Sequence, residues 1–91
     1  MDNVSVNRVR VTIHGMDYTL KGTAPTSHLN SVANTVDKMM TEISSTSTYM
    51  DERRVAVLTA LNLADELERL KQEYQELLSL LDDKTRGDGS P

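Results

Sequence analysis

The chain offers few groups that could carry out chemistry. Its 91 residues include two histidines, His14 and His28, and no cysteine. It also lacks a Gly-rich phosphate loop and a His-x-x-x-His pair. His14 ends an alternating, strand-like segment on its polar side, and His28 lies in the first turn of an expected helix. Because catalytic and metal sites need several convergent groups, we predict two surface histidines, no catalytic residue, no metal site and no cofactor.

The charge distribution argues against binding to nucleic acid. The net charge is −4. Residues 1–54 hold six basic and six acidic side chains, whereas residues 55–91 hold four basic and eight acidic ones. A protein that neutralises phosphates needs a basic surface, and neither part of the chain has one. No stretch has the length and apolar character of a membrane span or a secretory signal, so we expect a cytoplasmic protein without membrane insertion.

One long helix dominates the elements that must position any site. The segment from Asp51 to Leu81 contains no Gly or Pro, and it begins with a residue type that caps helices. Along it, apolar residues recur alternately four and three positions apart, which is the a/d spacing of a coiled coil. These residues, which we call the seam, are Ala56, Ala60, Leu63, Leu67, Leu70, Tyr74, Leu77 and Leu81. We predict that another copy of the same helix covers the seam.

Charges beside the seam favour a parallel pair of helices. In that arrangement Glu66, at a g position, faces Lys71 at the next e position of the partner. An antiparallel pair instead brings Glu66 toward another glutamate. Each such contact contributes only about 0.2–0.5 kcal/mol, so the preference is weak. We predict a homodimer, with a tetramer as the alternative.

The first half of the long helix needs a second cover. Between Val55 and Ala64 the helix is apolar on nearly all sides, and such a helix is buried on all sides. Val57, Leu58, Leu61 and Ala64 lie off the seam, so another helix at the seam leaves them uncovered. We therefore predict that the N-terminal half of the chain packs against them.

A β-hairpin is predicted near the N-terminus. Residues 8–14 alternate between polar and apolar side chains, as a half-buried strand does. Residues 15–17 are the expected turn, and residues 18–22 are the expected return strand. Two strands alone are only marginally stable, so the hairpin must lie on a helix or pair across an oligomer.

An amphipathic helix is expected to follow the hairpin. Apolar residues recur on one face over residues 27–44, and Thr26 is the expected N-cap. The polar run over residues 44–48 consists of poor helix formers and is interpreted as a hinge.

The fold class is therefore α+β: a small head of a β-hairpin and an amphipathic helix, followed by a long C-terminal coiled-coil helix. We divide the chain into a head over residues 1–54 and an oligomerisation helix over residues 55–82, whose first half also packs in the head. Residues 83–91 contain no Ala, Val, Leu, Ile, Met or aromatic residue and are predicted to form a disordered tail.

In this order, the segments resemble the ZapA family of bacterial cell-division proteins. The strongest part of the resemblance is the block AVLTALN at residues 56–62, preceded by YMD at residues 49–51. The strand and turn VTIHGMDYTL and the helix HLNSVANTVDKMMTEI match the family's opening segments. The resemblance covers residues 8 to about 81 with the right spacings.

The resemblance implies a non-enzymatic partner of FtsZ, the tubulin-like GTPase that polymerises at mid-cell. Proteins of the family bind FtsZ filaments through the head and oligomerise through the C-terminal helix, so that they bundle filaments and stabilise the division ring. The implied location is the cytoplasmic side of the mid-cell division site. FtsZ is acidic, and the implied contact residues are the basic ones of the head: Arg8, Arg10, Lys21, Lys38, Arg53 and Arg54. Arg8 and Arg10 share the polar side of the first strand and are the first choice.

The alternative function is that of a dimeric ribbon-helix DNA-binding regulator. In that case Arg8, Arg10 and Thr12 would point from the hairpin into a groove of the DNA. The neutral head and the acidic helix argue against it. A third class, an enzyme subunit or a chaperone-like adaptor, is neither supported nor excluded by the sequence.

Overall fold

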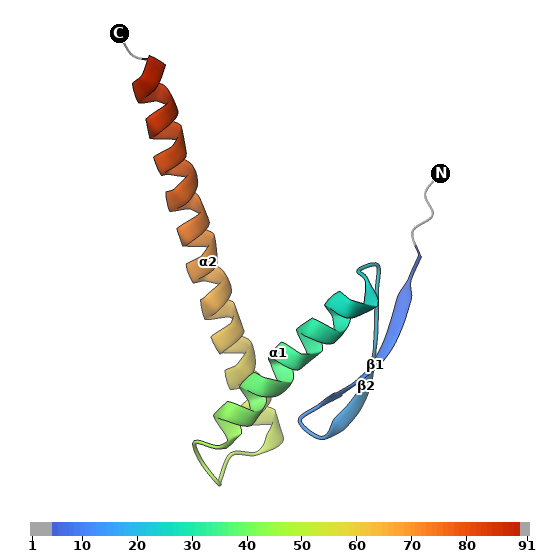
Figure 1. Ribbon diagram of the computed structural model, residues 1–91. Helices are drawn as coiled ribbons and strands as arrows, with labels where there is room; N and C mark the ends of the chain where they lie inside the picture. The colour runs from blue at the N-terminus through green and yellow to red at the C-terminus, as the bar shows by residue number, and fades with distance from the viewer. Residues whose placement is uncertain (1–4, 90–91) are drawn as a thin grey trace. The chain divides into compact units, whose positions relative to one another are not determined.

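The computed structural model describes residues 5–89 and contains two strands followed by two helices. The elements are β1 (Asn7–Ile13), β2 (Met16–Gly22), α1 (Thr26–Ser44) and α2 (Glu52–Gly89) (Figure 1). The predicted α+β class, with a hairpin, an amphipathic helix and a long C-terminal helix, is confirmed. The chain divides into two compact units, residues 1–59 and 60–91, which we call the head unit and the stalk unit and describe separately.

The hairpin turns one residue earlier than the sequence predicts. β1 and β2 are antiparallel, and their last pair joins Ile13 to Met16, which leaves His14 and Gly15 as a two-residue turn. Both turn residues have positive φ, 51° at His14 and 82° at Gly15, which is the pattern of a type I′ turn. Gly15 adopts this conformation without strain, whereas His14 needs support from its surroundings. The prediction that His14 belongs to the strand is therefore wrong.

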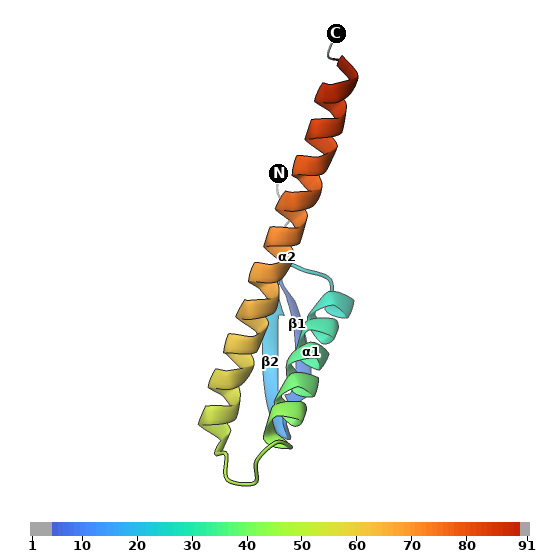
Figure 2. The ribbon, with the colours of Figure 1, turned by 90° about the vertical axis from the view of Figure 1, so that its left-hand side faces the viewer.

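α1 lies alongside the hairpin and packs on β1 (Figure 2). The carbonyl of Pro25 accepts hydrogen bonds from the backbone N–H groups of His28 at 3.0 Å and Leu29 at 3.1 Å. Pro25 is thus the N-cap, and no side chain caps this end. Thr26 is the first helical residue, so its predicted role as N-cap is wrong.

The polar run after α1 ends that helix, as a hinge must. Ser44, Ser45 and Thr46 each donate a side-chain hydrogen bond to the carbonyl three residues earlier, at 3.0, 2.7 and 2.7 Å. The carbonyls of Thr41 and Ile43 also accept backbone N–H groups, from Ser45 and Thr46 at 3.1 Å, so side chains and backbone together close the end of the helix. The predicted hinge is therefore present, and it leads the chain into α2.

Asp51 caps α2, as predicted. Its side-chain Oδ1 accepts a hydrogen bond from the backbone N–H of Arg54 at 2.8 Å, and its carbonyl accepts one from Val55 at 3.0 Å. These are the contacts of an N-cap residue, which satisfies donors that the first turn of a helix leaves open.

α2 runs on to Gly89, beyond the end at residue 82 that the apolar pattern predicts. Residues 83–86 contain no Gly or Pro, so the helical backbone can propagate through them at little cost. Two (i,i+3) and (i,i+4) ion pairs support the polar side of the stalk unit, Lys71–Glu68 at 3.4 Å and Arg69–Asp65 at 3.0 Å. Residues 90 and 91 of the expected tail lie outside the described residues.

The core of the head unit is small. Among the described residues, the buried apolar side chains are Val11 from β1, Ala33 and Met40 from α1, and Val55 from α2. Thr59, also from α2, is the buried polar residue of this group, with 3% of its surface exposed. The core therefore lies where α1 meets β1 and the first turns of α2.

Candidate functional site

The outer face of the hairpin carries three of the predicted partner-binding residues. The strand register places Arg8 opposite Lys21 and Arg10 opposite Thr19, and all four side chains are exposed. Thr12 and Asp17 form the next pair on the same face. Arg8, Arg10 and Lys21 are thus brought together by the pairing of the strands.

The three cations on this face differ in their surroundings. Arg10 Nη2 lies 3.9 Å from Asp17 Oδ2, and Thr12 donates a hydrogen bond to Asp17 Oδ1 at 2.8 Å. Asp17 therefore partly neutralises Arg10. Arg8 and Lys21 face each other as like charges, which destabilises a cross-strand pair. The Arg8–Lys21 pair is consequently the part of the face best suited to bind an anionic group.

The remaining predicted contact residues come from other elements. Lys38 is exposed on α1, and Arg53 and Arg54 are exposed in the first turn of α2. They do not belong to the hairpin face, so the six candidates lie on three separate elements. Their contact with a partner stays a prediction.

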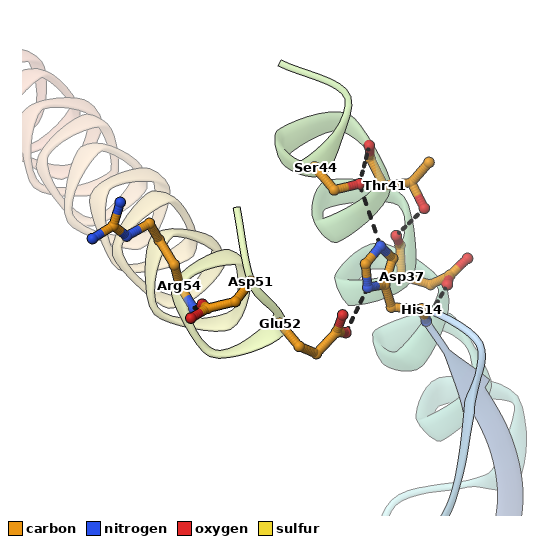
Figure 3. A network of polar contacts seen from close by, with 7 residues as sticks. All are labelled: His14, Asp37, Thr41, Ser44, Asp51, Glu52 and Arg54. Carbon is orange, nitrogen blue, oxygen red and sulfur yellow. Dashed lines mark hydrogen bonds and ion pairs between the residues drawn. The ribbon is translucent and has the colours of Figure 1, made fainter. Parts of the chain in front are cut away.

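His14 is held in a polar network that the sequence analysis missed (Figure 3). Its backbone N–H donates to Asp37 Oδ1 of α1 at 2.7 Å. Its ring Nδ1 lies 2.5 Å from Glu52 Oε2 of α2, and its Nε2 lies 3.3 Å from Ser44 Oγ at the end of α1. Only 23% of its side chain is exposed, so the predicted surface position is wrong for His14. His28, in contrast, is exposed as predicted.

The contacts of His14 join the turn of the hairpin to both helices. Asp37 accepts the N–H of a residue whose positive φ needs support, and Glu52 connects the ring to the start of α2. No local signal reveals these contacts, because the partners are 23, 30 and 38 residues away in the sequence. The one available clue is the His-Gly pair itself, since two-residue hairpin turns favour Gly at the second position.

The order Ser44–His14–Glu52 has the connectivity of a nucleophile, a base and an acid. Its surroundings do not fit that chemistry. The Ser44 hydroxyl donates to the carbonyl of Thr41 at 3.0 Å, so its proton is directed into its own helix. Neither Ser44 nor His14 lines the apolar groove of the head unit that is described below. The network is therefore a mechanical connection within the head unit.

A largely apolar groove lies in the head unit beside β2. Its volume is about 350 Å³. The groove exists because α1 packs on β1, while the apolar side of β2 stays open: Met16 is 56% and Tyr18 49% exposed. Side chains from all four elements line it: Ile13, Tyr18, Thr19, Leu20, Val36, Met40, Glu52 and Ala56.

The seam is exposed in the stalk unit taken by itself. Leu67, Leu70, Tyr74, Leu77 and Leu81 each keep between 54% and 61% of their surface exposed. A continuous, exposed apolar row of this length marks an interaction surface. Ala56 of the seam lies in the head unit and is exposed as well.

The head of the chain packs against the start of α2 only in part, whereas the sequence predicts that it covers the apolar residues there. Val55 and Thr59 are buried in the head unit, but Val57 remains 54% exposed. The head of the same chain therefore does not supply the cover that was predicted for Val57.

Sites of two other kinds are not found in the described part of the chain. Within residues 5–82, whose side chains the structure describes, no three His, Cys, Asp or Glu side chains are grouped so that they could hold a metal ion. Over the same residues, no helix has the length and apolar character needed to cross a membrane.

Comparisons with a family model and with individual proteins point to the same family. The model of the family "Cell division protein ZapA" matches residues 9–86. A cell division protein ZapA from Geobacillus sp. (strain WCH70) is 45% identical over 74 residues, which cover 81% of this chain and 85% of that protein. Another from Shouchella clausii (strain KSM-K16) is 37% identical over 73 residues, which cover 80% of this chain and 94% of that protein.

A solved structure is similar in fold as well as in sequence. It is a ZapA mutant dimer from Geobacillus stearothermophilus, 40% identical to this chain, with a TM-score of 0.73. The match covers 90% of this chain and 95% of that one. The similarity thus extends over the hairpin, both helices and the seam.

Proposed function

The chain belongs to the ZapA family of cell division proteins, and we propose that it binds FtsZ filaments and cross-links them as a homodimer. The family resemblance inferred from the sequence is thereby confirmed, and with it a role in cell division. The finer proposal is a protein without catalytic activity or cofactor that acts in the cytoplasm at the mid-cell division ring. The observation that carries it is the exposed seam of α2 in a chain similar to a solved dimer.

Burial of the exposed seam contributes a free energy of the size that association of two copies requires. Fully burying a large apolar side chain contributes roughly 1.5–3 kcal/mol, so the half-exposed Leu and Tyr residues of the seam contribute about 1 kcal/mol each. Five such residues on each of two chains give roughly 10 kcal/mol. That is comparable with the association cost of about 4–15 kcal/mol. Additional burial at the head unit would therefore decide how tight the dimer is.

The hairpin face supports the proposed contact with FtsZ. Arg8 and Lys21 face each other without forming an ion pair to another described residue, and both are exposed. A carboxylate between them would relieve their repulsion. A single surface contact of this kind is weak, about 0.2–1 kcal/mol. Two heads on one dimer make the second contact effectively intramolecular, so weak heads can still cross-link filaments.

Co-sedimentation with FtsZ polymerised in GTP tests the proposal. The wild-type protein is expected to enter the pellet and to increase light scattering by bundling. Replacing Arg8 and Lys21 together by Glu removes two attractions and adds two repulsions, which together reach about 1.4 kcal/mol, so binding should weaken about tenfold. Arg69→Glu makes the same kind of change on the stalk unit, outside the six candidates, and is expected to have little effect. If the wild-type protein stays in the supernatant at near-physiological salt, the proposal is wrong.

The DNA-binding alternative uses the same outward face and is not proposed. Asp17 holds Arg10 in an ion pair on that face, and residues 1–54 have no net charge. Both features weaken attraction to phosphates.

A further inference from the structure

The head unit is not complete within one chain. Among the described residues, its buried apolar side chains number four, namely Val11, Ala33, Met40 and Val55. A core of this size is too small to offset the entropy lost on folding, and small domains of this kind complete their cores by oligomerisation or other cross-links. The apolar side of β2 is the part left uncovered, with Met16 and Tyr18 about half exposed.

The groove beside β2 includes the first residue of the seam. Ala56, the first seam residue, lies in the wall of the groove, and Glu52 lies in the same wall one turn earlier. A second copy that packs on Ala56 therefore lies at the opening of the groove. This shared residue identifies the occupant as another copy of the chain, in agreement with the dimer seen for the similar structure.

The heptad frame shows which residue of that copy arrives there. The frame that places Glu66 at g and Lys71 at e puts Ala56 at d, Glu52 at g and Val57 at e. In a parallel coiled coil, a g residue lies beside the e residue of the next heptad on the partner helix. For Glu52 that neighbour is Val57 of the second copy, an apolar residue that its own head leaves 54% exposed.

We infer that Val57 of each copy packs into the groove beside β2 of the other, so that each head is completed by its partner. The inference rests on the dimer of the proposed function and specifies where the two heads meet. It explains why Val57 and the apolar side of β2 are both uncovered in the single chain.

Disulfide trapping between two differently tagged copies tests the inference. The chain contains no cysteine, so each introduced thiol is unique. One copy has Tyr18→Cys or Leu20→Cys in the groove, and the co-expressed copy has Val57→Cys. Mild oxidation is expected to link most of the mixed dimers with at least one of the two groove positions. Because the cysteines are in different chains, the product reports only contacts between copies.

Arg54→Cys provides the matched control. It lies in the same region of α2 at a b position, away from the seam, and only the backbone of Arg54 takes part in the cap. It should cross-link to Tyr18→Cys at least tenfold less than Val57→Cys does. Equal cross-linking of the two would overturn the inference, as would a dimer by mass that cross-links at neither groove position.

A second measurement does not depend on cysteine geometry. Val57→Asp is expected to raise the dissociation constant of the dimer at least tenfold in sedimentation equilibrium, whereas Arg54→Asp should change it less than threefold. Similar effects of the two substitutions would contradict the groove assignment. FtsZ co-sedimentation of the wild-type protein distinguishes this inference from the proposed function. If the dimer bundles FtsZ but shows no Tyr18–Val57 cross-link, the proposed function stands and the groove contact is wrong. If the dimer cross-links but does not bind FtsZ, the groove contact stands and the proposed function is wrong.

Discussion

Thr59 offers a direct test of how the core of the head is formed. The residue is 3% exposed, and its hydroxyl Oγ1 has no hydrogen-bond partner among the described residues. A buried hydroxyl without a partner costs about 1–3 kcal/mol, because the group has lost its water and gained nothing. Replacing it by the methyl group of valine keeps the shape of the side chain. Thr and Val also have similar helix propensities, so the backbone is not affected.

We therefore expect Thr59→Val to increase the free energy of unfolding by about 1–2 kcal/mol per chain. For a chain of this size, 1 kcal/mol raises the melting temperature by about 4–8 °C. The measurement is thermal and urea unfolding by circular dichroism, at one fixed protein concentration because the stability of a dimer depends on it. Thr59→Ser is the control: it keeps the hydroxyl, loses the methyl group and should reduce stability by about 1 kcal/mol.

The opposite result would refute the reasoning. If Thr59→Val destabilises the protein by more than Thr59→Ser does, the hydroxyl has a partner in the working assembly. The head unit of one chain supplies no such partner among the described residues, and a second copy is the source that the proposed dimer offers.

Two further substitutions test the seam and the His14 network. Leu70→Glu removes about 1 kcal/mol of apolar burial per copy and places a carboxylate in the seam, so light scattering should give the mass of a monomer. The control, Gln72→Glu on the outer side of the helix, should leave a dimer. An unchanged mass for Leu70→Glu would mean that the seam is misassigned. Asp37→Ala removes the acceptor for the His14 N–H and should lower the free energy of unfolding by about 1–2 kcal/mol, measured in urea. Asp37→Asn keeps an acceptor oxygen and should cost less than half as much; equal losses would rule out the hydrogen bond as the cause.

Features with a local or periodic signal were predictable from the sequence. The seam follows from spacing alone, and Asp51 was recognised as a cap because a cap acts within three residues of itself. The alternation over residues 8–14 located the first strand for the same reason. The N-cap of α1 was missed because the carbonyl of Pro25 makes the contact, and a backbone group leaves no trace in the sequence.

Features that depend on distant residues were not predictable. His14 sits in a turn only because Ile13 pairs with Met16, and that register is decided by the whole strand. Its ring contacts join residues that folding brings together from three elements. Of the candidate contact residues, the strand register gathers Arg8, Arg10 and Lys21, whereas Lys38 lies on another element. The alternation of the first strand indicated the Arg8 and Arg10 pair, but the position of Lys21 opposite Arg8 required the register.

The exposure of Val57 links the folding of the head to the pairing of chains. α2 contributes Val55 and Thr59 to the core of its own head, and Val57 between them points away from that core. If Val57 completes the partner's head, then separating the helices also uncovers the apolar side of β2 in both copies. The head and the dimer would then be lost together, because a core of four buried apolar side chains has little stability of its own. The hairpin face with Arg8 and Lys21 would consequently be presented only in pairs, which is the condition under which a weak contact can cross-link two filaments.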